Sequence, residues 1–329
     1  MARSVQYSTL LQAYEGGSVV ERQRTLSREV ALRGVGLHTG ADVTVRIAPA
    51  AANHGIIFVR TDGAPVEIPA ADRFLSGSAY ATTLTRGDLS ISTVEHLLSA
   101  LRGIGIDNAR ISIDGPEVPI LDGSSLPFVD AIREAGFKSQ AARRRYIALL
   151  KPISVRSGDK EILALPSNRY EATYAIDFPH PAIGYQAATT EISAEAYADS
   201  IAGARTFTLL RDVEALRRAG LVRGGSLDNA LVVDENGVMN GALRFPDEFV
   251  RHKILDLIGD LSLLGAPLKA HIIAFKGGHA LHAALMDRIQ KDPDAWIWSS
   301  SEAQLPPSHL ARFAHLTERL IPNRASLTA

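Results

Sequence analysis

The first third of the chain alternates apolar and polar positions as β-strands do. Residues 43–47 place Val or Ile at every second position, which predicts a strand with one buried face. A second apolar run at 56–59 follows a loop that contains Gly55, and the alternation returns at 111–113. We therefore expect the chain to begin as a β-hairpin or meander.

Helical spacing replaces this alternation at two places. Apolar side chains recur every three or four residues over 94–104, directly after the sequence Ser-Thr-Val-Glu at 92–95. This sequence predicts a capping box, in which the side chains of Ser92 and Glu95 each satisfy a free backbone amide at the helix start. A second helix is expected over 125–136, with a proline in its first turn and a glycine at its end.

The second half repeats the order of strands before helices. We expect strands at 147–155, 161–165, 170–178 and 270–275, and helices at 211–219, at 247–264 and after Gly278. The polar segment 138–145 lacks periodicity, and we interpret it as a linker between the halves. The predicted fold class is therefore α+β, with a sheet and helices on one of its faces in each half.

These patterns divide the chain into four parts. Residues 1–21 form an N-terminal extension, and residues 22–140 form domain I, which carries Glu95 and His96. Residues 141–290 form domain II, and residues 291–329 form a C-terminal tail outside the periodic pattern. We expect the tail either to pack loosely or to be mobile.

Composition narrows the classes of function. With 35 Lys and Arg against 36 Asp and Glu, the chain lacks the positive field that nucleic-acid binding or a polybasic membrane anchor requires. It has no Cys, which excludes disulfides, thiolate metal sites and cysteine nucleophiles, so a metal site must use His and carboxylate. No apolar run approaches the ~18 residues of a membrane span, and the N-terminus lacks the apolar centre of a signal peptide. We therefore expect a cytoplasmic protein.

The predicted helix at 247–264 carries the first candidate site. His252 and Asp256 lie four residues apart, so both side chains project from one helix face, and Asp260 lies one turn further along. An imidazole and a carboxylate at this spacing can hold a divalent ion, although such pairs often form only a surface hydrogen bond. The polar stripe is either the solvated side of the helix or the wall of a site.

Glu95 and His96 supply the second candidate. In one interpretation, Glu95 completes the capping box and His96 is an ordinary first-turn histidine. In the other, His96 is a third metal ligand and Glu95 is a base beside the metal. Two His and one carboxylate, with the fourth position left to water, form a catalytic rather than a structural zinc arrangement.

Two glycine-containing motifs complete the candidates. The sequence Lys-Gly-Gly-His at 276–279 places His279 at a strand-to-helix corner, where an ordinary loop histidine is the simpler interpretation. The sequence GVGLHTG at 34–40 fails the dinucleotide-binding fingerprint because position 39 is Thr, and no phosphate-loop Gly-Lys-Ser/Thr occurs. We interpret these glycines as a tight turn between strands.

Together these segments resemble the UDP-3-O-acyl-N-acetylglucosamine deacetylases, zinc amidases of lipid A biosynthesis in Gram-negative bacteria. The similarity covers about residues 23–289 in the family's order, and its long ungapped stretches are highly specific. They are QRTL at 23–26, GVGLHTG at 34–40, STVEHLLSALRGIGIDN at 92–108, PEVPILDGSSLPFV at 116–129, DFPHPAIG at 177–184, ARTF at 204–207, FVRHKILDLIGDL at 249–261 and KGGHAL at 276–281.

The resemblance implies a fold, a metal and an activity. The fold would be two similar domains packed as a β-α-α-β sandwich, with the active site between them. His96, His252 and Asp256 would bind Zn²⁺, with Fe²⁺ as the alternative in vivo. The activity would be hydrolysis of the N-acetyl group of UDP-3-O-(3-hydroxyacyl)-N-acetylglucosamine to UDP-3-O-acyl-glucosamine and acetate, the committed step of lipid A biosynthesis.

The resemblance also implies catalytic roles. Glu95 would be the general base and His279 the general acid. Asp260 would orient His279, and Thr206 would donate a hydrogen bond to the oxyanion.

The remaining implied contacts are with the substrate, an acylated UDP-sugar. Lys253 and Lys160 would lie near the diphosphate, and Phe178 would face the nucleobase. The passage for the acyl chain would be lined by Phe207, Val213, Leu216, Val222 and Leu227. We expect a monomer that contacts the inner membrane peripherally.

The chain departs from the family's pattern in the N-terminal extension, in the tail and at His282-Ala283, where the family often has asparagines. Two alternatives stay open. One is a zinc hydrolase that acts on another N-acyl sugar or amide, which equal rates on substrates with and without the acyl chain would favour. The other is a non-catalytic sugar-nucleotide-binding protein, against which Glu95 and His279 argue.

Overall fold

The computed structural model describes residues 12–13 and 20–316 of the 329-residue chain. Most of the predicted N-terminal extension, 1–21, lies outside the described residues. Within the described ranges, no helix combines the length and the apolar character that crossing a membrane would need.

Five strands of the first half form one mixed sheet. They are β3 (Val30–Val35), β4 (Asp42–Pro49), β5 (Ile56–Arg60), β6 (Val66–Pro69) and β10 (Ala109–Ile113). The order is β3-β4-β10-β5-β6, and β10 runs antiparallel to β4 and parallel to β5. The expected hairpin of 43–47 with 56–59 is therefore wrong. The later strand β10 lies between them, because its fully buried Ile111 and Ile113 belong at the centre of the sheet.

Seven strands of the second half form the other large sheet. They are β12 (Tyr146–Leu149), β13 (Ile153–Ser157), β14 (Lys160–Pro166), β15 (Tyr170–Asp177), β16 (Tyr185–Glu191), β20 (Leu268–Phe275) and β21 (Trp296–Ser299). The central strand β20 pairs with β14, β15 and β12. All of its residues except the last are buried. The apolar run at 272–275 predicts this, and the polar side chains of Lys269 and His271 are buried with it.

The described part of the tail, residues 291–316, packs against this sheet, which contradicts the expectation of a loose or mobile segment. Strand β21 pairs with β12 and extends the sheet. Further along, Phe313 and Leu316 pack on buried Leu163 and Ile273. Residues 296–299, Phe313 and Leu316 of the tail are therefore part of the folded body.

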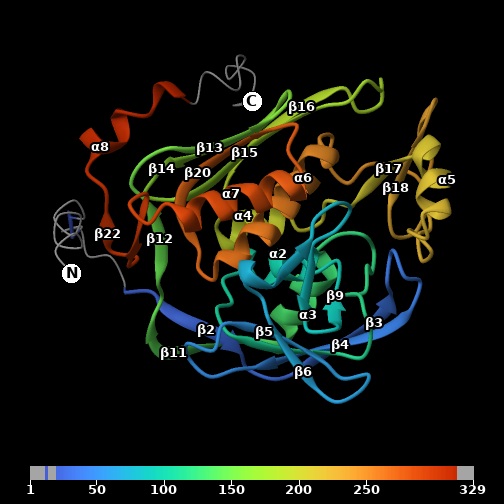
Figure 1. Cartoon of the computed structure of the whole chain (residues 1–329), viewed down its shortest axis with the longest axis horizontal. Coiled ribbons are helices and arrows are strands. Elements are labelled where there is room, and N and C mark those ends of the chain that lie inside the picture. The colour runs from blue at the N-terminus through green and yellow to red at the C-terminus, as the bar shows by residue number, and fades with distance from the viewer. Residues whose placement is uncertain (1–11, 14–19, 317–329) are drawn as a thin grey trace.

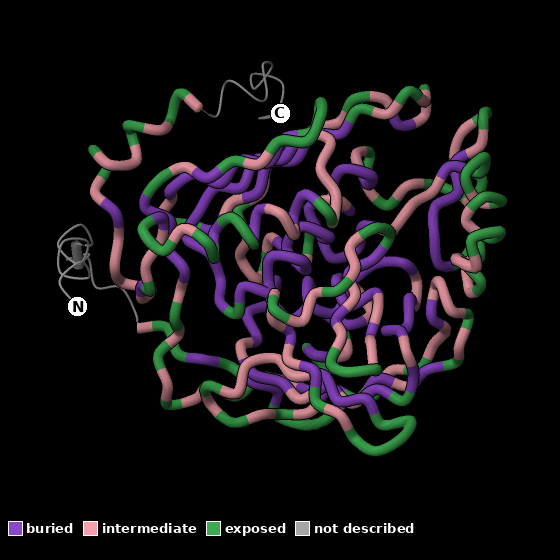
Figure 2. The backbone as a smooth tube through the Cα atoms, in the orientation of Figure 1, coloured by how far each residue is buried: buried purple, intermediate pink, exposed green. Residues whose placement is uncertain are grey.

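The helices lie between the two large sheets or at their margins (Figure 1). They are α2 (Glu95–Gly103), α3 (Leu126–Ala135), α4 (Ala194–Ser200), α5 (Leu210–Arg218), α6 (Glu248–Leu261), α7 (His279–Lys291) and α8 (Pro307–Ala311), with the 3₁₀ turns η1 (Asp72–Phe74) and η2 (Ser262–Leu264). Figure 2 shows that buried residues concentrate in this middle region. The fold is thus mixed α and β, as predicted, and the helices expected at 125–136, 211–219 and 247–264 are confirmed.

Shorter strands complete the described chain. They are β1 (Gln12–Ala13), β2 (Arg22–Leu26), β7 (Leu75–Gly77), β8 (Thr83–Arg86), β9 (Leu89–Ile91), β11 (Phe137–Arg143), β17 (Phe207–Leu209), β18 (Leu231–Asp234), β19 (Gly237–Val238) and β22 (Ala303–Gln304). Strand β11 pairs with β2, so residues 138–143 of the predicted linker form a strand. The segment is largely exposed, and a solvated ribbon needs no apolar alternation.

Helices α2 and α6 cross at the centre of the molecule. Every residue of α2 is buried. In α6, Gly259 lies so close to α2 that a Cβ atom on it would be 2.1 Å from the backbone oxygen of Glu95. Only glycine permits this approach, which fixes the start of α2 against the polar stripe of α6.

Candidate active site

The start of α2 differs from the predicted capping box. No side chain caps the helix, and Thr93 has a φ of 55°, so the chain enters α2 through a left-handed residue rather than an extended cap. The carboxylate of Glu95 instead turns away from the helix start and accepts the backbone N–H of Thr82 at 3.0 Å. This geometry presents Glu95 to α6 and α7.

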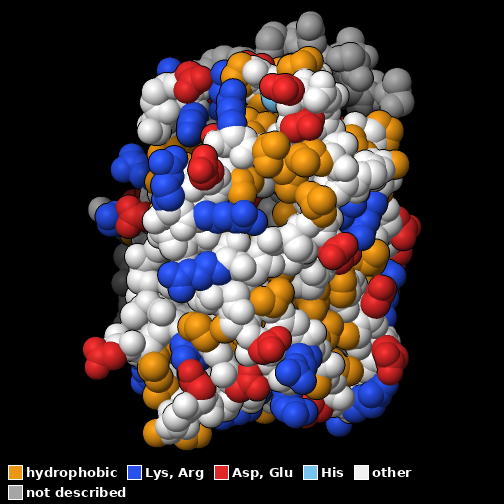
Figure 3. Space-filling model, turned by 90° about the vertical axis from the view of Figure 1, so that its right-hand side faces the viewer, with side chains coloured by type: hydrophobic (Ala, Val, Ile, Leu, Met, Phe, Trp, Pro, Cys, Tyr) orange, Lys and Arg blue, Asp and Glu red, His pale blue; other side chains and the backbone are white. Residues whose placement is uncertain are grey.

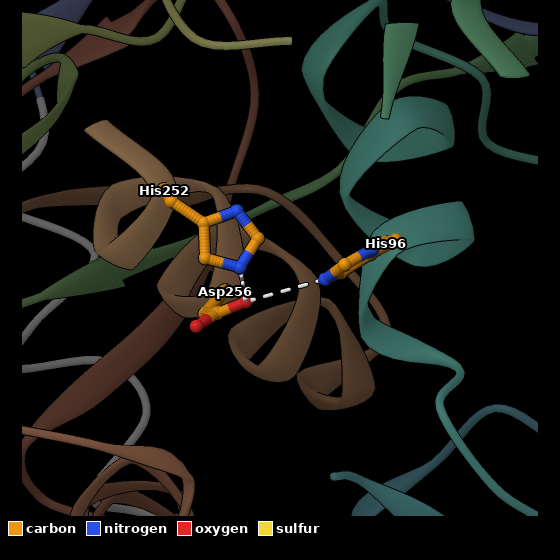
Figure 4. A group of neighbouring side chains, drawn as sticks. All are labelled: His96, His252 and Asp256. Atoms are coloured by element: carbon orange, nitrogen blue, oxygen red, sulfur yellow. Dashed lines mark ion pairs between the residues drawn. The ribbon is translucent and has the colours of Figure 1, made fainter. Parts of the chain in front are cut away.

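His96, His252 and Asp256 form a buried cluster between α2 and α6 (Figure 4). Asp256 Oδ1 lies 3.3 Å from His252 Nε2 and 3.6 Å from His96 Nε2. Ligand atoms at 2.0–2.1 Å from a tetrahedral ion lie about 3.3 Å from one another, so these two separations are compatible with ligation of one ion. The residues four apart on α6 thus meet the histidine predicted from α2.

The protonation of the cluster also fits a divalent metal. Burial lowers the pKa of His252 to about 3, so its ring is neutral. Its Nδ1 lies 3.0 Å from the backbone oxygen of Ala204, to which it donates, which leaves the Nε2 lone pair facing Asp256. Burial alone would raise the pKa of Asp256, but His252 and Lys253 hold this pKa well below its usual range. A lone pair and a carboxylate facing each other are stabilised by a cation between them.

An acid–base pair lies beside the cluster. Burial raises the pKa of Glu95 to about 7. His279, the first residue of α7, lies with Nε2 3.9 Å from Glu95 Oε1 and Nδ1 2.7 Å from Asp260 Oδ2. Burial lowers the pKa of His279, but the charge of Asp260 outweighs it and raises the pKa to about 10. One group is therefore a base near neutral pH, and the other holds a proton.

Asp260 contacts more side chains than the sequence indicated. Its Oδ1 accepts the hydroxyl of Thr82, and its Oδ2 is 2.7 Å from both His279 Nδ1 and His282 Nδ1. Asp260, His279 and His282 could together also hold a metal. Their 2.7 Å separations are direct hydrogen bonds, shorter than the distance between two ligands of one ion. Sequence reasoning missed His282 as a site residue, although its i, i+3 spacing from His279 on a helix was a usable signal.

A cavity of about 700 Å³ opens beside α5, β17 and β18. It is lined by eight of the predicted substrate and oxyanion residues: Phe178, Thr206, Phe207, Val213, Leu216, Val222, Leu227 and Lys253. Lys160 is not in this lining and begins β14 as an exposed residue. Figure 3 views the molecule from the side on which α5, β17 and β18 lie in Figure 1, and hydrophobic side chains gather there among Lys and Arg.

Lys253 connects the cavity to the cluster. Its Nζ lies 2.8 Å from Asp256 Oδ2, and its side chain lines the cavity. Leu37 and His38 also line the cavity, and sequence reasoning missed them because GVGLHTG was interpreted only as a turn. That turn is present, since Gly40 has a φ of 69° and donates to Gly36, but it also carries side chains into the site.

The site combines side chains that can bind a metal, a carboxylate whose pKa lies near neutral pH and a protonated imidazole. This combination is typical of a metal-dependent hydrolase. The chain belongs to the UDP-3-O-acyl N-acetylglycosamine deacetylase family, whose sequence profile matches residues 23–291. Members of this family are metalloenzymes that act on an acylated UDP-sugar.

Curated relatives agree with this assignment. UDP-3-O-acyl-N-acetylglucosamine deacetylase from Myxococcus xanthus is 50% identical over 276 residues, which is 83% of this chain and 88% of the relative. The enzyme of the same name from Citrifermentans bemidjiense is 48% identical over 276 residues, 83% of this chain and 90% of the relative. A third, from an Anaeromyxobacter species, is 45% identical over 287 residues, 86% of this chain and 94% of the relative.

Proposed function

We propose that this protein hydrolyses the N-acetyl group of UDP-3-O-(3-hydroxyacyl)-N-acetylglucosamine, the committed step of lipid A biosynthesis. The amide C–N bond breaks, a C–O bond to the acetyl carbon forms, and the products are acetate and UDP-3-O-acyl-glucosamine. The observation that carries the proposal is the buried cluster of His96, His252 and Asp256 beside Glu95 and the apolar cavity. Family membership supports the choice of substrate.

We assign the metal to His96, His252 and Asp256, as Zn²⁺ or, in vivo, Fe²⁺. When bound, a divalent ion supplies Lewis-acid chemistry, which polarises the acetyl carbonyl and acidifies water. The 3.3 Å and 3.6 Å separations and the fixed tautomer of His252 support this ligand set. Lys253 neutralises the second oxygen of Asp256 and so favours ligation through the first.

Glu95 and His279 divide the proton transfers. Glu95, with a pKa near 7, accepts the proton of the attacking water. His279 donates through Nδ1 to Asp260, so its second proton sits on Nε2, the nitrogen that faces Glu95 and the reaction space. From Nε2 that proton passes to the amine nitrogen as the C–N bond breaks, and Thr206 donates to the developing oxyanion.

The substrate's remaining groups extend from this point. The acyl chain lies along Phe207, Val213, Leu216, Val222 and Leu227, where each buried CH₂ contributes ~0.8 kcal/mol. Phe178 faces the nucleobase, and Lys253 and Lys160 meet the diphosphate. Lys160 lies outside the cavity lining, at the exposed start of β14.

The broader organisation belongs to the same proposal. Domain I (22–140) and domain II (141–290) are two similar units that pack as a β-α-α-β sandwich with the site between them. We further propose a cytoplasmic monomer that touches the inner membrane peripherally, consistent with exposed Leu210, Leu227 and Met239 near the cavity.

Metal analysis coupled to a deacetylation assay tests the proposal. The wild type should bind about one divalent ion, lose turnover on chelation and regain it with Zn²⁺. His252→Ala should lose metal and activity, whereas the matched control His315→Ala, on an exposed residue, should retain both. Full metal content in His252→Ala would contradict the ligand assignment.

Two further measurements separate the alternatives. Glu95→Gln should retain metal and lose at least ~100-fold in kcat, which a non-catalytic binding protein would not show. A substrate without the acyl chain should react more slowly than the acylated one. Equal rates would indicate a hydrolase of another amide.

A further inference from the structure

We propose that His282 is a positioning residue for this deacetylation. As a neutral imidazole, it donates a hydrogen bond to the same Asp260 oxygen that His279 uses, and so keeps the His279 imidazolium aligned and able to release its proton. The kinetic part of this inference rests on the proposed function, whereas the hydrogen-bonding part does not.

The arrangement comes from one turn of α7 facing one residue of α6. His279 and His282 are three residues apart, so both rings project toward Asp260. Each Nδ1 lies 2.7 Å from Asp260 Oδ2, and the rings stand nearly perpendicular, at 82°. The other carboxylate oxygen accepts the hydroxyl of Thr82. Asp260 is therefore held by three donors and cannot follow His279 if that ring moves.

Tyr174 determines the tautomer of His282. Its hydroxyl lies 3.2 Å from His282 Nε2, and both side chains are fully buried. Burial raises the pKa of Tyr174 well above its usual value, so the phenol keeps its proton and donates it to Nε2. Nε2 is then an acceptor, and the ring proton lies on Nδ1, where it faces Asp260.

Charge balance assigns the proton of the pair to His279. Burial lowers the pKa of His282, whereas the pKa of His279 is raised. One carboxylate stabilises one imidazolium, and His279 additionally faces Glu95. His282 is thus a neutral second donor to Asp260.

A second donor changes how tightly Asp260 holds the His279 proton. If His279 were its only imidazole partner, the negative charge of Asp260 would stabilise the His279 imidazolium more strongly. His279 would then hold its proton more tightly. The N–H of His282 withdraws part of this charge. Glu95, Asp256 and His38 also act electrostatically on His279. These groups stay the same in a His282 variant, so the variant isolates the second donor.

Three substitutions separate positioning from packing. His282→Leu removes the donor and fills the space, and His282→Asn keeps a donor at the δ position. Tyr174→Phe removes the hydroxyl that fixes the tautomer. Loss of a hydrogen bond to a charged group shifts a pKa by about one unit, about tenfold in proton affinity.

The readout is the pH profile of kcat/KM. In His282→Leu, the high-pH limb should move upward by about one pH unit and kcat should fall about tenfold, with metal content intact. His282→Asn should restore the wild-type limb and most of kcat, and Tyr174→Phe should fall between the two. An unmoved limb in His282→Leu, or a failure of His282→Asn to restore it, would overturn the proposal. Loss of metal in His282→Leu would make His282 a ligand instead.

Histidine ¹⁵N NMR of the substrate-free protein keeps the two proposals distinguishable. We expect His282 as the neutral tautomer with its proton on Nδ1 at every pH at which the protein is folded, and His279 as the titrating ring. A protonated His282, or one with its proton on Nε2, would refute the positioning role whatever the activity. An absence of deacetylation with this NMR result would refute the proposed function alone.

Discussion

Gly259 is the residue whose substitution most directly perturbs the assembly of the site. It lies in α6, between Asp256 and Asp260, against the start of α2. In Gly259→Ala, the new Cβ would lie 2.1 Å from the backbone oxygen of Glu95 and 2.8 Å from its carbonyl carbon. Both obstructing atoms are backbone, so no side-chain rotation relieves the clash.

The geometry gives the size of the effect. A carbon next to a carbonyl oxygen normally lies about 3.3 Å away, so α2 and α6 must separate by about 1 Å. Such a displacement changes the distance between His96 and the ligands on α6, and a 1 Å misplacement of reacting groups can cost about 100-fold in rate. Overpacking costs about 1–3 kcal/mol, and the better helix propensity of alanine offsets about 1 kcal/mol of it.

The assay measures metal content, kcat and urea unfolding on the same preparation. Gly259→Ala should bind metal more weakly, lose about 100-fold in kcat and unfold at lower urea. The matched control is Gly63→Ala, where a Cβ meets nothing within 4 Å. If Gly259→Ala kept the metal content, kcat and unfolding midpoint of the wild type, the close crossing would not be what holds the site together.

Three further predictions concern a buried ion pair, the protonation of His279 and the lining of the cavity. The buried carboxylate of Glu248 pairs with the guanidinium of Arg205 at 2.8 Å. Glu248→Gln removes this charge and should lower the free energy of unfolding, measured by urea titration, by about 3 kcal/mol. A decrease below about 1 kcal/mol would contradict a stabilising role of the pair. Because the charge of Asp260 outweighs burial and raises the pKa of His279 from 6.5 to about 10, the folded protein keeps a proton that the unfolded chain releases. The contribution of His279 to the free energy of unfolding should therefore be complete below pH 6.5 and lost as the pH rises toward 10. Over this range the urea stability of the wild type should fall more steeply than that of His279→Gln. Parallel curves for the two proteins would refute the raised pKa of His279. Leu216→Ala should lower kcat/KM about tenfold for the acylated substrate and much less for one without the acyl chain, and equal losses would remove Leu216 from the acyl passage.

The local elements were predictable, and their long-range arrangement was not. The helix at 247–264 has strong periodicity, and the strand at 270–275 contains the apolar run 272–275; both elements are present. The insertion of β10 between β4 and β5 depends on pairs of residues that lie 53 to 68 positions apart in the sequence, which periodicity does not encode. The tail strand β21 and the ribbon strand β11 were missed for a related reason, since both are edge elements whose pairing requires little apolar alternation.

The candidate site divides in the same way. The i, i+4 spacing of His252 and Asp256 put both on one helix face, but the sequence left open whether they formed a site. Their proximity to His96 depends on the close contact of α6 with α2 at Gly259. The sequence of α6 alone does not show that α2 lies against this glycine. The predicted capping role of Glu95 failed because Thr93 adopts a left-handed conformation. The link from His282 to Tyr174 joins α7 to β15 across more than a hundred residues.

Anomalous diffraction from crystals loaded with Zn²⁺ tests the central claim, that three side chains from two helices hold one divalent ion. We expect a single strong peak about 2.0–2.2 Å from His96 Nε2, His252 Nε2 and Asp256 Oδ1. A peak between Asp260, His279 and His282 instead, or imidazoles of His96 and His252 that turn away from a common point, would contradict it.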